Sequence, residues 1–402
     1  MVASLFSRAD LAPRDPILGL TEAFAADARP FKVNLGVGVY YGDDGKIPLL
    51  RAVRAAEQAR AAAATPRGYL PIDGIADYDA AVQKLLLGAD ARLITAGRVV
   101  TAQAVGGTGA LKIGADLLKR LGPDARVLIS DPSWENHRAL FEGAGFDVAN
   151  YPYYDSAAHG LNFSGMVSAL ATATPGTVVV LHACCHNPTG VDPTQDQWRE
   201  IARVVRSRDL VPFLDMAYQG FGDGIEADGF TVRLFAESGA PLLISSSFSK
   251  SFSLYGERVG ALTLVTESRD ESARMLSQLK RVIRSNYSTP PTHGGSVVAA
   301  VLNDAALRAT WEEELAQMRE RIKQMRAQLV DGLRARGVGR DFGFVLKQRG
   351  MFSYSGLTAG QVERLRAEFG IYAVSTGRIC VAALNSRNID AVCDAIAAVL
   401  KR

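Results

Sequence analysis

Residues 242–260 read Leu-Leu-Ile-Ser-Ser-Ser-Phe-Ser-Lys-Ser-Phe-Ser-Leu-Tyr-Gly-Glu-Arg-Val-Gly. The stretch begins with a short apolar run, residues 242–246, which predicts a buried β-strand. It then turns polar, with serines surrounding Lys250 and with Arg258 eight positions further on. A buried strand that runs directly into a polar segment is typical of α/β sheets, in which ligands bind beyond the carboxyl ends of the strands.

The same pattern recurs through the middle of the chain. Short apolar runs, most of which end at a polar or turn residue, stand at residues 99–105, 127–130, 177–181 and 210–215. Helical sequence separates some of them, as at residues 110–121 and 197–207. Strands that alternate with helices predict an α/β fold, with a mostly parallel sheet covered by helices on both faces.

The C-terminal part of the chain has a different pattern. Between residues 312 and 336 apolar side chains recur every three or four positions, which predicts one long amphipathic helix. Strand-like pieces then precede a last helix at residues 388–400. We therefore predict a large domain at residues 46–310. Residues 1–45 together with residues 311–402 are predicted to form a smaller α+β domain, and a length of 402 residues favours two domains.

The composition restricts the classes of protein and partner. The net charge of +3 is small and no basic block stands out, so neither nucleic acid nor an anionic membrane is expected as a partner. No uncharged apolar run approaches the roughly 20 residues that span a bilayer. The first ten residues lack a signal-peptide pattern, and four cysteines form no disulfide framework. We expect a soluble protein of the reducing cytoplasm.

Lys250 and Arg258 together suggest a cofactor. A lysine that can lose its proton forms a Schiff base with an aldehyde, and an arginine among hydroxyls can hold a phosphate. Pyridoxal phosphate (PLP) needs both groups. A lone lysine after a strand is more commonly a surface residue, but the neighbouring serines and Arg258 favour the functional interpretation.

Three other polar segments follow predicted strands, and each also has a purely structural interpretation. Gly106 to Gly109 opens a helix and could bind phosphate through its N–H groups, although a tight turn explains it equally well. Asp215 could pair with a protonated ring nitrogen or cap a helix, and Tyr218 could then donate to a phenolate oxygen. Asn187 lies in a His-Asn-Pro-Thr-Gly segment that also fits a turn.

The roles of several histidines and of two arginines are not decided by their local sequence. His182 to His186 reads His-Ala-Cys-Cys-His, but no second Cys/His pair completes a zinc set, so no metal is predicted. His137 could support a functional residue or be an ordinary buried histidine. Arg378 and Arg284 have small or polar neighbours, and each could be a carboxylate clamp or a solvated side chain.

Together these motifs resemble the class I, fold-type I PLP-dependent aminotransferases, in particular the aspartate and aromatic-amino-acid branch. The likeness spans nearly the whole chain, from Asp-Pro-Ile-Leu-Gly-Leu at residue 15 to Ser-Thr-Gly-Arg at residue 375. Between them lie Asn-Leu-Gly-Val-Gly-Val-Tyr at 34, Tyr-Leu-Pro-Ile-Asp-Gly at 69, Gly-Gly-Thr-Gly-Ala-Leu at 106, Asp-Pro-Ser-Trp-Glu-Asn-His at 131, Cys-Cys-His-Asn-Pro-Thr-Gly at 184, Asp-Met-Ala-Tyr-Gln-Gly at 215, the lysine run, Asn-Tyr-Ser-Thr-Pro-Pro at 286 and Gly-Met-Phe-Ser-Tyr-Ser-Gly at 350.

The resemblance implies a role for each matching residue. Lys250 forms the Schiff base and moves the proton, Asp215 pairs with the pyridinium nitrogen, and Tyr218 helps at the ring oxygen. The implied cofactor-binding residues are Tyr69, Gly107, Thr108, Trp134, Asn187, Asp215, Tyr218, Ser247, Ser249, Lys250 and Arg258. The implied substrate-binding residues are Gly38, Trp134, Asn187, Arg284 and Arg378. His137 would support Asp215, and Tyr69 would reach the phosphate of a neighbouring subunit, so a homodimer with shared active sites is expected.

The implied activity is amino transfer by a ping-pong cycle. The preferred hypothesis is transfer from tyrosine, phenylalanine or aspartate to 2-oxoglutarate, with Arg378 on the α-carboxylate and Arg284 on an acidic side chain. An aspartate-specific enzyme is the alternative. A PLP-dependent lyase or decarboxylase on the same fold would keep Lys250 and Asp215. A non-enzymatic regulatory module would be expected to carry a DNA-binding extension before Asp15, and the sequence offers none.

Overall fold

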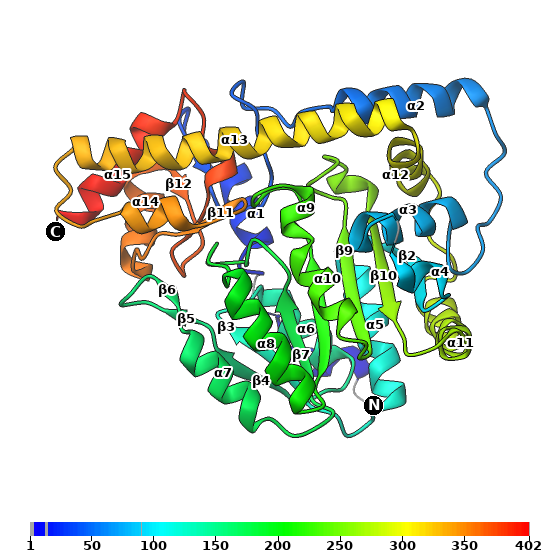
Figure 1. Ribbon diagram of the computed structural model, residues 1–402. Helices are drawn as coiled ribbons and strands as arrows, with labels where there is room; N and C mark the ends of the chain where they lie inside the picture. The colour runs from blue at the N-terminus through cyan, green and yellow to red at the C-terminus, as the bar shows by residue number, and fades with distance from the viewer. Residues whose placement is uncertain (1–3, 13–14, 90, 402) are drawn as a thin grey trace.

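The computed structural model describes residues 4–12, 15–89 and 91–401 (Figure 1); residues 1–3 of the N-terminal stretch considered above lie outside that description. The strands are β1 Val33–Asn34, β2 Val99–Val105, β3 Val127–Asp131, β4 Val148–Pro152, β5 Tyr154–Asp155, β6 Gly160–Leu161, β7 Val178–His182, β8 Val211–Met216, β9 Leu242–Ser247, β10 Val259–Val265, β11 Phe352–Tyr354, β12 Ile371–Tyr372 and β13 Arg378–Cys380.

The helices lie between and after these strands. They are α1 Leu18–Ala26, α2 Arg51–Ala63, α3 Ala76–Leu87, α4 Arg92–Thr95, α5 Gly106–Leu121, α6 Glu135–Gly143, α7 Phe163–Thr172, α8 Gln195–Ser207, α9 Ile225–Asp228, α10 Phe230–Glu237, α11 Arg269–Asn286, α12 His293–Asn303, α13 Ala305–Ala335, α14 Ala359–Phe369 and α15 Ile389–Leu400. The described residues also form the short 3₁₀ helices η1 Leu5–Arg8, η2 Tyr255–Glu257, η3 Gly343–Lys347 and η4 Val381–Ala383. Within the described residues, no helix is long and apolar enough to cross a membrane.

A seven-stranded sheet forms the centre of the large domain, in the order β2-β10-β9-β8-β7-β3-β4. All neighbouring pairs except those of β10 are parallel, which confirms the mostly parallel sheet predicted from the sequence. Strand β10 was not predicted. It pairs antiparallel with both β2 and β9, so it returns the chain beside the strand that leads to Lys250.

Helices cover both faces of this sheet. Helix α5 packs against β8, β9 and β10, and α11 packs beside it, whereas α7, α8 and α10 cover the other face. A glycine at position 114 permits the close contact of α5, because a Cβ there would lie 2.5 Å from the Phe213 ring. Helix α5 begins at Gly106, directly after β2, and not at the predicted residue 110. Its first turn therefore lies at the carboxyl edge of the sheet.

The elements that follow the large sheet pack together with the N-terminal strand β1. Strand β1 pairs parallel with β12, and β11 pairs antiparallel with β13. Helix α13 runs from these elements to α2 and α12 beside the large sheet (Figure 1). It begins earlier than predicted because Asp304 caps it, accepting from the N–H groups of Ala306 and Leu307.

Candidate active site

A cavity of about 410 Å³ lies at the carboxyl ends of the parallel strands, where the C-terminal elements meet the sheet. Twelve of the fourteen site residues predicted from the sequence line it. They are Gly38, Gly107, Thr108, Trp134, Asn187, Asp215, Tyr218, Ser247, Ser249, Lys250, Arg258 and Arg378. Gly38 and Arg378, which are 340 positions apart in the sequence, therefore contribute to one site.

Lys250 projects into this cavity three residues after the end of β9. Its Nζ lies 5.0 Å from the centroid of the Tyr218 ring. Desolvation lowers the pKa of Lys250 to about 8, and the positive charges of Arg258 and Arg378 act in the same direction, whereas Asp215 opposes them. A substantial fraction of the amine is therefore neutral, and nucleophilic, near physiological pH.

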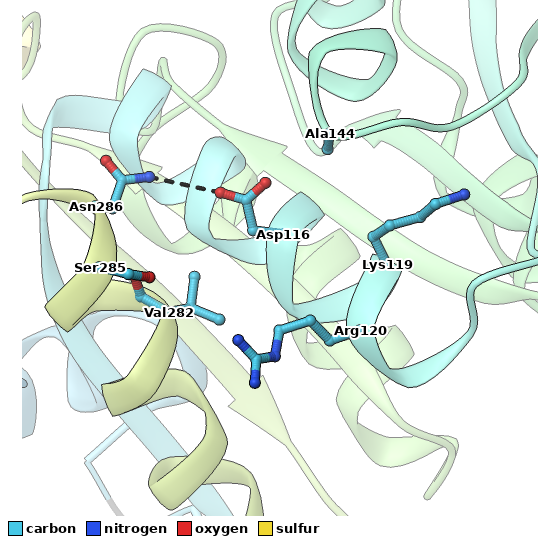
Figure 2. A pocket seen from close by; sticks show the side chains of 7 residues that line it. All are labelled: Asp116, Lys119, Arg120, Ala144, Val282, Ser285 and Asn286. Atoms are coloured by element: carbon cyan, nitrogen blue, oxygen red, sulfur yellow. Dashed lines mark hydrogen bonds between the residues drawn. The ribbon is translucent and has the colours of Figure 1, made fainter.

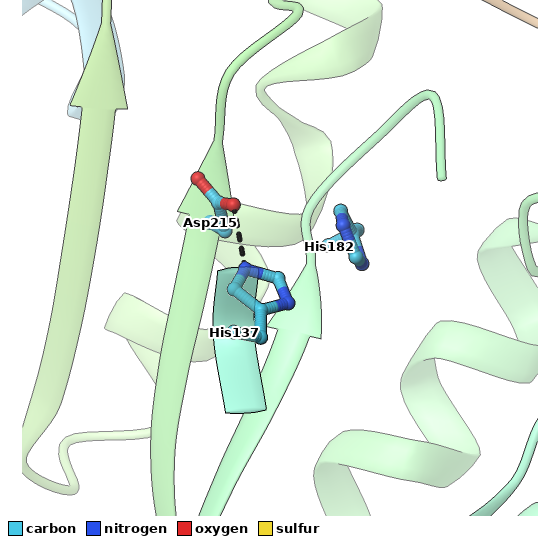
Figure 3. A group of neighbouring side chains, drawn as sticks. All are labelled: His137, His182 and Asp215. Atoms are coloured by element: carbon cyan, nitrogen blue, oxygen red, sulfur yellow. Dashed lines mark hydrogen bonds and ion pairs between the residues drawn. The ribbon is translucent and has the colours of Figure 1, made fainter. Parts of the chain in front are cut away.

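Asp215 and the buried His137 form a hydrogen bond (Figure 3), and His137 is in turn hydrogen-bonded to Ser133. Asp215 Oδ2 lies 2.9 Å from His137 Nε2, and His137 Nδ1 lies 2.9 Å from Ser133 Oγ. An ionised carboxylate can only accept hydrogen bonds, so we assign the His137 proton to Nε2. The unprotonated Nδ1 then accepts a hydrogen bond from the Ser133 hydroxyl. Burial alone would raise the pKa of Asp215. The hydrogen bond from His137 and nearby positive charge outweigh burial, and that pKa lies below the ordinary aspartate value.

Two further histidines lie near His137 and differ in their hydrogen bonds. His186 contacts Ser130 Oγ at 2.9 Å and Thr189 Oγ1 at 2.8 Å, so both of its ring nitrogens are engaged. His182 lines the cavity beside His137, its Nε2 has no hydrogen-bond partner within the described residues, and burial holds its pKa well below the ordinary histidine value. The rings of His182 and His186 lie 4.5 Å apart, centroid to centroid, and His182 with His137 and Asp215 offers three possible ligand atoms within 4.8 Å of one another.

Part of the cavity gathers several groups that suit a phosphate. The start of α5, the hydroxyls of Thr108, Ser247 and Ser249, and the Arg258 guanidinium all border it. Arg258 is fixed by its left-handed backbone at φ 56° and by donation to the Tyr255 carbonyl at 2.9 Å. A glycine is required at position 106, because its φ is +69° and a Cβ would lie 2.5 Å from Arg258 Nη2. Helix N–H groups, hydroxyls and a guanidinium together suit a dianion.

Arg378 occupies a different part of the same cavity. Its side chain is only 1% exposed, its Nη1 donates to Asn187 Oδ1 at 3.0 Å, and its Nη2 donates to the Gly36 carbonyl at 2.7 Å. The guanidinium carbon lies 4.3 Å from the centroid of the Phe352 ring. Gly38 is in contact with the same ring, since a Cβ there would lie 2.6 Å from Phe352 Cζ. A rigidly held guanidinium beside an apolar wall suits a carboxylate attached to a carbon chain.

Two predicted site residues lie away from the cavity of their own chain. Tyr69 is 98% exposed, in the loop between α2 and α3. Arg284 is also exposed, near the end of α11, and its guanidinium donates to the Ser288 hydroxyl. Neither residue lines the cavity that holds Lys250.

The sequence analysis missed several residues that line the cavity. Phe352 forms the wall under Arg378, and Tyr255 accepts the N–H of Tyr40 at 2.9 Å. Both lie inside segments that were quoted as motifs, so their positions were visible, but only the fold brings their side chains to the site. Leu18 and Val39 also lie in quoted motifs, but as apolar residues they were not singled out.

A second hollow of similar size lies between α5 and α11 (Figure 2). Asp116, Lys119, Arg120 and Asn286 border it, and Asn286 donates to Asp116 at 3.5 Å. None of the residues predicted from the sequence lines this hollow. Among the described residues that border this hollow, no amine lies beside a buried carboxylate. We therefore look for catalytic residues in the first cavity.

The fold and this cavity define an aminotransferase of classes I and II: residues 30–396 match that family, and the chain belongs to it. It is 68% identical over 397 residues to an aspartate aminotransferase of Pseudomonas aeruginosa, a match that covers 99% of this chain and 100% of the relative. It is 51% identical over 399 residues to an aromatic-amino-acid aminotransferase of Escherichia coli K12, which covers 98% and 100%. The solved aromatic-amino-acid aminotransferase of Burkholderia pseudomallei, covalently bound to pyridoxal phosphate, superposes with a TM-score of 0.97 at 70% identity and covers 99% of this chain and 100% of that one. This membership favours amino transfer over the lyase and regulatory alternatives.

The family is PLP-dependent, and the residues present here fit that cofactor. The cavity combines an amine with a lowered pKa, a group of hydroxyls and a guanidinium that suit a phosphate, and a buried carboxylate. These groups match the aldehyde, the phosphate and the ring nitrogen of PLP in turn.

Proposed function

We propose that this aminotransferase moves the amino group of aromatic and acidic L-amino acids, namely tyrosine, phenylalanine and aspartate, to 2-oxoglutarate in a ping-pong cycle. The observation that carries the proposal is one cavity that contains Lys250, Asp215 and Arg378. The names of its relatives support both substrate classes, since aspartate and aromatic-amino-acid aminotransferases are both among them.

The cofactor, when bound, supplies an electron sink for the electron pair that the substrate's α-carbon retains when its proton leaves. Asp215 would keep a proton on the ring nitrogen, since its own pKa is held below the ordinary value. Tyr218 and Asn187 would hydrogen-bond the ring oxygen, and Trp134 would cover one face of the ring. Gly107, Thr108, Ser247, Ser249 and Arg258 would bind the phosphate.

Proton transfer is the task of Lys250. Its Nζ, which is neutral at a pH above its pKa of about 8, would accept the proton from the substrate's α-carbon and hold it for return later in the cycle. Arg378 would hold the substrate's carboxylate so that the α-carbon lies within reach of that nitrogen. Phe352 and Trp134 would exclude water from this part of the cavity.

Substrate choice is tested by a screen of amino donors with 2-oxoglutarate. We expect turnover of tyrosine, phenylalanine and aspartate. In Arg284→Leu, kcat/KM for aspartate should fall about 100-fold, because a charged contact to its side-chain carboxylate is lost. The same value for tyrosine should change little. Rapid turnover of aspartate with none of tyrosine or phenylalanine would instead identify an aspartate-specific enzyme.

We also propose a homodimer whose subunits share their active sites. The support is that Tyr69 and Arg284 are exposed and lie outside the cavity of their own chain, although their motifs match binding residues. Each would then complete the site of the other subunit.

Hybrid dimers test this arrangement. Lys250→Ala lacks the amine of its own site, and Tyr69→Ala/Arg284→Leu lacks the groups given to the partner. Random mixing produces hybrids in which one site of two is intact, so aspartate turnover should recover to about a quarter of the wild-type value. The control is the aspartate turnover of each variant measured without mixing. Turnover no higher than the sum of these controls would exclude shared sites.

Two further assignments belong to this proposal. We place the domain boundaries after residues 45 and 310. Structures with and without a bound carboxylate would test whether the two parts move as rigid bodies about these boundaries.

A cytoplasmic location is supported by the four cysteines, which are all free and buried. Cell fractionation that recovered the protein outside the cytoplasm would contradict it.

A further inference from the structure

The surroundings of Arg378 contain an unexpected negative charge. This guanidinium is almost fully buried, and its hydrogen bonds go to two neutral oxygens, of Asn187 and Gly36. Its Nε is buried without a hydrogen-bond partner among the described residues. The carboxylate within ion-pair distance is that of Glu135, whose Oε2 lies 4.0 Å from Arg378 Nη1.

Glu135 is the first residue of α6, where an acidic side chain commonly stabilises the start of a helix. That role does not account for its Oε2. The side chain as a whole is 31% exposed, but Oε2 is buried and accepts no hydrogen bond within the described residues. It therefore points away from water and from the N–H groups of its own helix, toward the buried arginine.

A neighbouring tyrosine supports this placement. Tyr354 lies directly opposite Arg378 in the β11–β13 pair. Burial is the main cause that raises the pKa of Tyr354, and the negative charges of Asp131 and Glu135 add to it. The carboxylate of Glu135 thus faces the paired strands that carry both Tyr354 and Arg378, across the junction between the large sheet and the C-terminal elements.

We propose that Glu135 is the resting counter-ion of Arg378 and sets the affinity of the site for the substrate's carboxylate. The inference rests on the proposed function of Arg378 as the carboxylate clamp. A carboxylate that binds Arg378 meets Glu135 as a second negative charge close by and is repelled by it. Amino-acid substrates and 2-oxo-acid products carry the same carboxylate, so Glu135 weakens the binding of both to Arg378. Weaker binding of the product favours the product release that a ping-pong cycle requires.

The test is the binding of 3-phenylpropionate, a monocarboxylate that lacks the amino group and cannot react, to the PLP-loaded enzyme. In Glu135→Gln its Kd should fall about three- to tenfold, because the repulsion is lost while the shape is kept. KM for amino donor and acceptor should fall by a similar factor. A gain in affinity is the signature, since a merely structural disturbance would weaken binding.

Two variants serve as matched controls. Glu142→Gln removes an exposed charge from the same helix, which pairs with Arg138, and should leave the Kd unchanged. Glu135→Asp keeps the charge and should remain close to wild type. An equal or higher Kd in Glu135→Gln would overturn the inference, as would the same gain in Glu142→Gln.

Arg378→Leu separates this inference from the proposed function. If Arg378→Leu binds 3-phenylpropionate as tightly as wild type, Arg378 is not the carboxylate clamp and the proposed function of that residue fails. If binding is lost there, Glu135→Gln should give no further gain in the Arg378→Leu background. A gain that persisted without Arg378 would overturn the role of Glu135 alone.

Discussion

Replacement of Lys250 by alanine is expected to reduce kcat by at least about 10⁴-fold, because the variant loses both the nucleophile and the proton carrier. The other groups that line the cofactor end of the cavity stay in place, so PLP should still bind, but without a covalent link. Steady-state turnover measures the first effect. For the second, borohydride reduction followed by mass spectrometry should find the cofactor attached to the wild-type chain and not to the variant.

The control is Lys84→Ala, which removes an exposed lysine from α3 and should leave both measurements unchanged. Turnover of Lys250→Ala within tenfold of wild type would contradict the assignment. So would recovery of the reduced cofactor on a different lysine of the wild-type chain.

Replacement of Asp215 by alanine is expected to lower kcat about 1,000-fold, because a buried charge partner of the cofactor ring is lost. A second effect concerns Lys250. Asp215 raises the pKa of Lys250, so without it that pKa should fall below the wild-type value of about 8. Since only the neutral amine reacts, the rate of covalent attachment of PLP to apoenzyme should level off at a lower pH than in wild type.

Ser133→Ala provides the comparison, because Ser133 touches His137 and not Asp215. It should reduce kcat by less than about tenfold, as expected for the loss of one neutral hydrogen bond. If Asp215→Ala lost no more activity than Ser133→Ala, the ring-nitrogen role would be wrong. A pH profile of attachment that moved to higher pH would contradict the electrostatic argument separately.

Much of the central sheet could be predicted because its strands carry local signals. The runs that became β7, β8 and β9 are apolar and each meets a polar segment at its end, which sets both the strand and the edge where ligands bind. Strand β10 was missed although it is equally buried, because no α-helix separates it from β9 and only the 3₁₀ helix η2 lies between Lys250 and β10. Its antiparallel direction depends on pairing with β2 and β9, and no local pattern encodes that choice.

The residues of the candidate site likewise include some that the sequence predicts and others that only the structure brings to the cavity. The sequence identified Lys250, Asp215 and Arg378 because each lies in a motif whose residue types suit one part of PLP or its substrate. It did not identify Phe352 as a site residue. A phenylalanine in a short strand is most often core, and only the packing of β11 against Gly38 and Arg378 makes it a wall of the cavity.

The sequence by itself predicted the chemistry of this protein, since the residues that follow the predicted strands include an amine, a carboxylate and groups that suit a phosphate. Only the tertiary structure decided which charges meet. Glu135 and Arg378 are 243 positions apart, yet their side chains approach to 4.0 Å. Likewise, Tyr69 and Arg284 carry the motifs of binding residues but lie outside their own cavity. The physical reason is that periodicity and spacing act within a few residues, whereas contacts between distant segments follow from how helices and strands pack.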